Sequence, residues 1–122
     1  MTTENEGFRG HVGIEHVGNE GEDVSVVALE ADERHLNAHG SVHGGAIATL
    51  CDSAMGAAVW TGENRPVTIE MTVTYLEPVP AGQVLAKARV RRRGSRITIV
   101  ECDVTNRDGA DVAHAIATFT TV

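Results

Sequence analysis

Residues 45–60 read Gly-Ala-Ile-Ala-Thr-Leu-Cys-Asp-Ser-Ala-Met-Gly-Ala-Ala-Val-Trp, and this stretch decides the fold. Ala, Leu and Met favour helix, and the stretch is too long for an ordinary strand. Because it is apolar nearly all round, we expect a buried helix. Its polar or small exceptions fall at i, i+3, i+4 and i+7 and therefore share one helix face: Thr49, Asp52, Ser53 and Gly56.

Strands flank this predicted helix on both sides. The apolar runs of residues 12–30 are interrupted by turn-forming residues, which predicts a two-stranded hairpin. After the helix, residues 67–75 alternate between apolar odd and polar even positions, the period of a strand. Three further strands are expected at 84–90, 96–106 and 111–122, so that all four strands after the helix form an antiparallel meander. We therefore expect one α+β domain over residues 1–122, with an antiparallel sheet wrapped round one long central helix and with residues 1–10 flexible or peripheral.

The composition and charge of the chain argue against several classes of protein. The net charge of −7 argues against nucleic acid, because phosphate backbones are bound by basic surfaces. No apolar run approaches the roughly 20 residues that span a bilayer. The polar, acidic N-terminus MTTENEGFRG does not resemble a secretory signal, so we expect a cytoplasmic protein. Two cysteines in apolar runs, Cys51 and Cys102, are expected to be buried free thiols.

A loop rich in histidine and glycine leads into the predicted helix. Backbone N–H groups at a helix start are unpaired and carry partial positive charge, and glycines let a ligand approach them closely. Gly44 and Gly45 are therefore candidates for an oxyanion hole, although a tight turn into the helix would also use two glycines. Asn37 can hydrogen-bond a substrate oxygen or form a turn, and His43 can act as acid–base group or as helix cap.

Asp52 is a carboxylate in the most apolar element of the chain. An unpartnered buried carboxylate is costly, so Asp52 belongs either to a water-filled cleft where chemistry takes place or to an exposed stripe with Thr49 and Ser53. Thr68, on the polar face of its strand, can hold a water molecule or be simply exposed. Gly44 and Asp52 lie about 12 Å apart along one helix, so joint action on one substrate carbon requires Asp52 of a neighbouring subunit.

Basic residues cluster at one place in this acidic chain. Six of the ten lie within residues 87–96, and four of the five arginines among these six are candidates for contacts with a small anion: Arg91, Arg92, Arg93 and Arg96. A solvated strand edge or an intersubunit ion-pair network would explain the same cluster. The histidines His35, His39 and His43 step by four, but the glycines among them argue against a helical metal site, and we expect no metal.

The pattern Asn37-x-x-Gly40-x-x-His43-Gly44-Gly45, followed by Ala48-Thr49-Leu50 and Asp52, resembles the hotdog-fold acyl-CoA thioesterases, in particular their phenylacetic-acid-degradation (PaaI-like) branch. The stretch Val67-Thr-Ile-Glu-Met-Thr-Val-Thr-Tyr-Leu76 is similar to the strand after the helix in that family. The similarity runs from about residue 12 to the C-terminus.

This resemblance implies a role for each residue. Gly44 would polarise the thioester carbonyl, and Asp52 of the partner subunit would be general base or nucleophile. Asn37 would position the carbonyl with support from His43, and Thr68 would hold the water. The arginines would meet the phosphates of CoA, with Gly45 beside the substrate. The resemblance implies no metal or redox cofactor, and it predicts a homo-oligomer: a dimer at minimum, with a tetramer expected.

This chain departs from some branches of the family at two positions. Those branches carry Glu at the position of Asp52 and a hydroxyl side chain one helical turn later, where this chain has Gly56. Two other functions fit the same scaffold. A non-catalytic acyl-CoA-binding module is the main alternative. A dehydratase or hydratase is the other, although that chemistry needs a catalytic histidine paired with an acid, and only His43 is placed for it.

Overall fold

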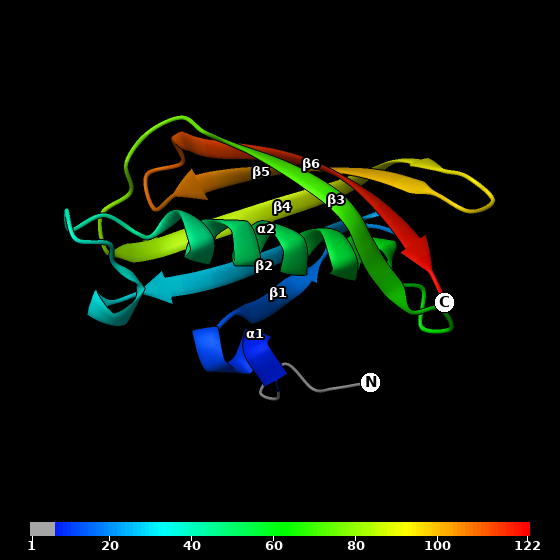
Figure 1. Cartoon of the computed structure of the whole chain (residues 1–122), viewed down its shortest axis with the longest axis horizontal. Helices are drawn as coiled ribbons and strands as arrows, with labels where there is room; N and C mark the ends of the chain where they lie inside the picture. The colour runs from blue at the N-terminus through cyan, green and yellow to red at the C-terminus, as the bar shows by residue number, and fades with distance from the viewer. Residues whose placement is uncertain (1–6) are drawn as a thin grey trace.

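The computed structural model describes residues 7–122. Two helices, one 3-10 turn and six strands follow one another along the chain (Figure 1). They are α1 (Gly7–Val12), β1 (Glu15–Asn19), β2 (Val24–Ala31), η1 (Glu33–His35), α2 (Gly44–Val59), β3 (Pro66–Tyr75), β4 (Gly82–Arg93), β5 (Thr98–Asn106) and β6 (Asp111–Thr121). The strands form one antiparallel sheet in the order β1-β2-β4-β5-β6-β3. This α+β architecture, a sheet curved round one long helix, is the predicted one.

The strand order corrects one expectation. The four strands after α2 do not form a simple meander, because β3 pairs with β6 and β4 pairs with β2. Only β4, β5 and β6 follow one another as neighbours. Alternation of apolar and polar residues identifies a strand but not its partner, which long-range packing decides. Here β3 crosses to the far edge of the sheet, so that α2 is enclosed from both sides.

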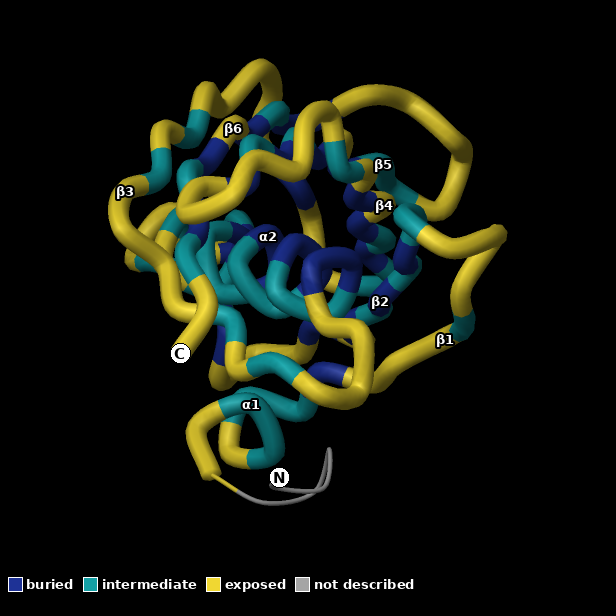
Figure 2. The backbone as a smooth tube through the Cα atoms, turned by 90° about the vertical axis from the view of Figure 1, so that its right-hand side faces the viewer, coloured by how far each residue is buried: buried dark blue, intermediate teal, exposed yellow. Residues whose placement is uncertain are grey.

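The predicted hairpin is present as β1 and β2, but residue 12 belongs to the preceding helix. Residues 7–10 of the segment expected to be flexible or peripheral begin α1, a short helix that lies under α2 (Figures 1 and 2). The remainder of that segment lies outside the described residues.

The core lies between α2 and the inner face of the sheet. Figure 2, which looks nearly along α2, shows the buried side of the helix turned toward the strands. Leu50, Cys51, Ala54 and Met55 are completely buried there, and a buried Leu or Met side chain contributes about 2 kcal/mol. Both cysteines are buried free thiols, as predicted. Contact with Cys51, together with burial, raises the pKa of Cys102, so this thiol stays protonated and unreactive.

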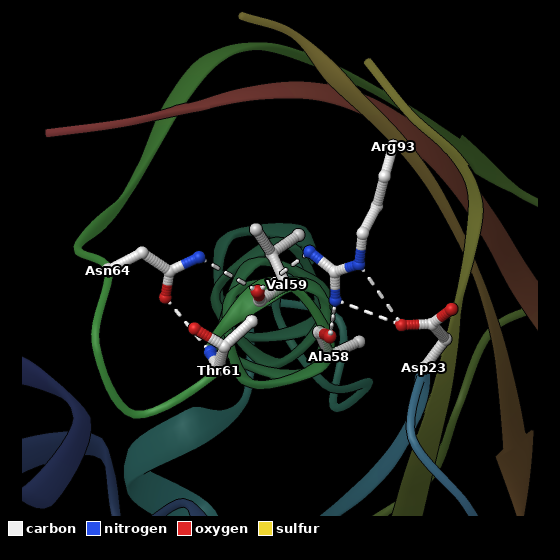
Figure 3. Close-up of polar contacts among 6 residues, drawn as sticks. All are labelled: Asp23, Ala58, Val59, Thr61, Asn64 and Arg93. Carbon is white, nitrogen blue, oxygen red and sulfur yellow. Dashed lines mark hydrogen bonds and ion pairs between the residues drawn. The ribbon is translucent and has the colours of Figure 1, made fainter. Parts of the chain in front are cut away.

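Side chains from neighbouring segments hold both ends of α2. At its start, His43 Nδ1 accepts a hydrogen bond from the Gly45 N–H over 2.8 Å. At its end, the Arg93 guanidinium donates to the carbonyls of Ala58 (3.2 Å) and Val59 (3.1 Å), as Figure 3 shows. The same guanidinium donates to Asp23 Oδ1 over 2.9 Å, which ties the helix end to the turn between β1 and β2. These contacts satisfy terminal backbone groups that a helix cannot satisfy itself.

Candidate active site

Asp52 and Thr68 meet across the opening between α2 and β3. The Thr68 hydroxyl donates a hydrogen bond to Asp52 Oδ1 over 2.6 Å. Asp52 is half-buried and Thr68 is exposed, so water reaches the pair. Asp52 is thus a carboxylate with a hydroxyl partner at the edge of the core, in contact with solvent.

A register shift in β3 makes this contact possible. Thr68 lies opposite Phe119 and Glu70 lies opposite Thr118, so Ile69 is one extra residue in β3. The shift puts Thr68 on the same side of the sheet as buried Phe119, whereas strict alternation places it on the outer, polar face. The expectation that Thr68 lies on the polar face is therefore wrong. An extra residue exchanges the two faces of a strand, and the sequence pattern alone does not reveal it.

Asp52 and Thr68 line an open pocket of about 730 Å³. Its floor is the polar and small face of α2 that the sequence predicts, including Thr49, Ser53 and Gly56. Three of the four aromatic side chains of the protein also line it: Phe8 from α1, Trp60 at the end of α2 and Phe119 from β6. The pocket therefore combines one carboxylate and the hydroxyls of Thr49, Ser53 and Thr68 with an aromatic wall, and the aromatic wall is suited to an apolar substrate group.

Gly44 and Asn37 line a second pocket, of about 520 Å³, on another side of the helix start. The Asn37 Oδ1 accepts from the N–H groups of His39 (2.9 Å) and Ser41 (3.1 Å), which shapes the loop. In residues 7–122 neither the Asn37 Nδ2 nor the Gly44 N–H donates a hydrogen bond to the protein. Both residues line this pocket, and these two donors have no partner from the described chain.

His43 and Gly45 line a third pocket, of about 480 Å³, with His35 and Phe8. The hydrogen bond from the Gly45 N–H to His43 Nδ1 occupies both groups, which corresponds to the capping alternative for His43. His35 is buried, and its Nε2 contacts the Val12 carbonyl over 2.6 Å. Nowhere in the described chain do three or more His, Cys, Asp or Glu side chains form a group able to hold a metal ion.

The candidate residues thus fall into separate pockets of one chain. Asp52 and Thr68 occupy the first, Asn37 and Gly44 the second, and His43 the third. Within a single chain, Gly44 and Asp52 therefore line different pockets.

The four predicted arginines differ in their surroundings. Arg93 is engaged at the end of α2 and with Asp23, as described above (Figure 3). The Arg91 guanidinium lies 3.5 Å from Glu101, which also attracts Arg89 at 3.9 Å. The exposed side chains of Arg92 and Arg96 make no hydrogen bond or ion pair with the part of the chain that the structure describes. All four lie at the hairpin of β4 and β5, beside the end of α2.

Sequence reasoning did not assign a site role to Tyr75, whose hydroxyl donates to the Gly44 carbonyl over 2.7 Å. A signal for it exists in the sequence. Tyr75 has the same parity as Met71 and Val73, which face α2 opposite the buried Ala117 and Ala115. A tyrosine at the end of an inward-facing row is able to reach the start of the helix.

Comparison with known proteins identifies the family. The model of the thioesterase superfamily matches residues 39–113, more than half of the chain. The chain belongs to the thioesterase superfamily. Among members with curated names, human acyl-coenzyme A thioesterase 13 is 32% identical over 85 residues, which cover 67% of this chain and 61% of that protein. The chain therefore spans about three fifths of the length of such relatives.

Solved structures of the thioesterase superfamily have the same hotdog fold as this chain, and PaaI is among them. The Escherichia coli PaaI protein from the phenylacetic acid degradation operon is similar with a TM-score of 0.90 and 27% identity, over 98% of this chain and 86% of that one. The smu.793 protein of Streptococcus mutans, bound to acetyl CoA, has a TM-score of 0.83 and 29% identity, over 90% and 89%. In this member of the superfamily, no helix among the described residues has the length and apolarity needed to cross a membrane.

Proposed function

We propose that this chain hydrolyses an acyl-CoA thioester to a carboxylic acid and free CoA. The observation that carries the proposal is the Asp52 carboxylate, held by the Thr68 hydroxyl at 2.6 Å in an open pocket with an aromatic wall. Membership of the thioesterase superfamily supports the reaction class. The names of relatives and the acetyl CoA in the Streptococcus mutans neighbour support the choice of CoA thioesters.

Asp52 acts in one of two ways. As general base it takes a proton from a water molecule whose oxygen attacks the thioester carbon, and the proton then passes to the departing CoA sulfur. As nucleophile it attacks the carbon itself, CoA thiolate leaves, and water cleaves the resulting anhydride. Thr68 donates to Oδ1 and leaves Oδ2 for either task. The lone pairs of the Thr68 oxygen remain able to accept a hydrogen bond from the attacking water.

In the proposed site, the developing oxyanion is stabilised at the start of α2. The Gly44 N–H has no partner within the described chain, and the helix dipole adds partial positive charge there. Asn37 shares this pocket and offers its free Nδ2 as a second donor. Gly45 lies beside the substrate but keeps its N–H on His43, so that His43 supports the site as a helix cap.

The reaction requires two copies of the chain. The eight positions from Gly44 to Asp52 rise about 12 Å along α2 at 1.5 Å per residue, and the two residues line different pockets. In the proposed homodimer, Gly44 of one copy and Asp52 of the other act on the same thioester. The free edge of β3 is a suitable contact, because an unprotected edge strand templates pairing with another chain.

Phosphate contacts are assigned to the exposed arginines at the β4–β5 hairpin. Arg92 and Arg96 have no ion-pair partner in the described chain, and Arg91 is only partly neutralised by Glu101. Arg93 contributes by fixing the end of the helix that carries Asp52.

We further propose one hotdog domain over residues 1–122 that assembles as a cytoplasmic homotetramer of two such dimers. The two free, buried cysteines fit a reducing compartment.

The test replaces Asp52 by Asn and measures thiol release from a panel of acyl-CoA thioesters. Asp52→Asn is expected to lower turnover at least about 100-fold, the usual effect of losing a general base or nucleophile, while CoA binding is kept. Asp103→Asn is the matched control, because Asp103 is an exposed carboxylate paired with His114 on the outer face of the sheet. Full turnover in Asp52→Asn removes Asp52 from the mechanism. Binding without thiol release by the unaltered protein favours a non-catalytic acyl-CoA-binding module.

A further inference from the structure

One peptide unit at the start of α2 is held from both of its sides. Its N–H group, that of Gly45, donates to His43 Nδ1 over 2.8 Å. Its carbonyl group, that of Gly44, accepts from the Tyr75 hydroxyl over 2.7 Å. Both holding groups are side chains, one from the loop before the helix and one from the end of β3. A peptide unit is planar, so two bonds on its opposite sides restrict its rotation.

The Tyr75 ring lies directly against Gly44. A Cβ atom added at Gly44 would meet the ring Cζ and the hydroxyl oxygen at 3.2 Å and Cε1 at 3.4 Å, closer than ordinary contacts. The absence of a side chain at Gly44 is therefore what lets Tyr75 reach the helix start. The two residues, 31 positions apart in the sequence, fit each other as a pair.

The held peptide is next to the one that carries the proposed oxyanion donor. The Gly44 N–H belongs to the peptide between His43 and Gly44, and Gly44 lines the same pocket as Tyr75 and Asn37. Preorganised donors are effective because they need no reorientation when charge develops. A donor on a two-glycine segment has much rotational freedom unless neighbouring groups remove it.

The Tyr75 hydroxyl is suited to permanent donation. Tyr75 is half exposed, and partial burial of its ring, with a smaller contribution from the Cys51 thiol, raises the pKa of Tyr75 above its ordinary value of 10.0. The phenol is therefore protonated throughout the neutral range.

We propose that Tyr75 is a positioning residue for thioester hydrolysis: with His43 it clamps the Gly44–Gly45 peptide, so that the Gly44 N–H is aimed at the developing oxyanion. This inference rests on the proposed function, because the oxyanion exists only if the chain hydrolyses thioesters. Tyr75 itself touches no reacting atom in this scheme. It acts only through the backbone of Gly44.

The decisive variant is Tyr75→Phe, which keeps the ring against Gly44 and removes only the hydroxyl. Losing an oxyanion donor outright lowers kcat about 10²- to 10³-fold, so loosening one is expected to lower kcat by about tenfold, with KM changed by less than about twofold. Thr118→Val is the matched control. It removes the hydrogen bond from Thr118 to Glu70 on the other face of β3, at 3.1 Å, and should leave kcat unchanged.

A double-variant cycle separates the clamp from general packing. If His43 and Tyr75 hold the same peptide, the variant with both His43→Ala and Tyr75→Phe loses less than the product of the single losses. Wild-type kcat in Tyr75→Phe, while Asp52→Asn is inactive, overturns the clamp and leaves the proposed function standing. A rise in KM with unchanged kcat also overturns it, since that pattern indicates a ground-state contact. Failure of the unaltered chain to release thiol overturns the proposed function, and the clamp with it.

Discussion

Thr68 donates its hydroxyl hydrogen to Asp52 Oδ1 across 2.6 Å, and the extra residue Ile69 in β3 brings the two side chains together. Without the shift, Thr68 would face away from α2. The contact fixes one oxygen of the carboxylate and leaves the other free. Because it joins an exposed residue to a half-buried one, it is expected to contribute little to the stability of the fold, and in the proposed mechanism it orients the Asp52 carboxylate.

Replacing Thr68 by Val keeps the shape of the side chain and removes the donor. In Thr68→Val, kcat is expected to fall by about tenfold, the usual consequence of losing one hydrogen bond to a charged group. The melting temperature should remain near that of the unaltered protein. Steady-state kinetics and thermal unfolding measure the two effects. A large drop in melting temperature with normal kcat would assign the contact to stability instead.

A substitution at Ile69 tests the proposed homodimer. Its side chain is 54% exposed on the edge strand β3, so a charge there opposes pairing of two such edges. Ile69→Lys is expected to shift the mass in light scattering from at least twice 12.9 kDa toward 12.9 kDa and to abolish thiol release together with assembly. Val17→Lys is the control, because Val17 is exposed on β1 at the opposite edge. An active monomer would contradict a site shared between subunits.

The arginines at the β4–β5 hairpin should affect only substrates that carry CoA phosphates. Arg92→Gln and Arg96→Gln are each expected to raise KM for acyl-CoA about threefold, as for exposed charge contacts, with a smaller effect at high salt. KM for the N-acetylcysteamine thioester of the same acid, which lacks the phosphates, should not change. Arg107→Gln, an exposed arginine in the turn after β5, serves as control. Equal effects on both substrates would place these arginines at the acyl group.

Arg93 should contribute to stability. Arg93→Gln removes the donors to the Ala58 and Val59 carbonyls and to Asp23, and it should lower the free energy of unfolding by about 1–2 kcal/mol. Asp23→Asn removes only the ion pair and should cost less than about 1 kcal/mol. Urea unfolding of both variants measures the difference. Equal losses would mean that the ion pair, and not the helix end, is what Arg93 stabilises.

The raised pKa of Tyr75 predicts that the free energy of unfolding changes at alkaline pH. Its pKa in the folded protein is raised, chiefly by partial burial, so the folded state binds the phenolic proton more tightly than the unfolded state does. This contribution is complete below pH 10, the ordinary pKa, and is lost as pH rises through the higher folded value. The unaltered protein should therefore lose stability relative to Tyr75→Phe only above about pH 10. A difference that varies between pH 7 and 9 would contradict this assignment.

Local patterns in the sequence determined much of this protein. The apolar run of residues 45–60 predicts a buried helix, and its four small or polar exceptions share one face because a helix repeats every 3.6 residues. The start of that helix at two glycines, with Asn37 and Asp52 at fixed spacings, was sufficient to predict the family and the candidate residues. Such features depend on neighbours along the chain, which the sequence displays directly.

The tertiary structure alone decided how these parts meet. The pairing of β3 with β6, the inward turn of Thr68 at Ile69 and the fit of Tyr75 against Gly44 all join residues far apart in the sequence. It also decided that Arg93 holds the end of α2 while Arg92 and Arg96 stay exposed, although the sequence presents them as one cluster. The physical reason is that alternation and helical period determine which face a side chain occupies, whereas close packing among distant segments determines what it touches.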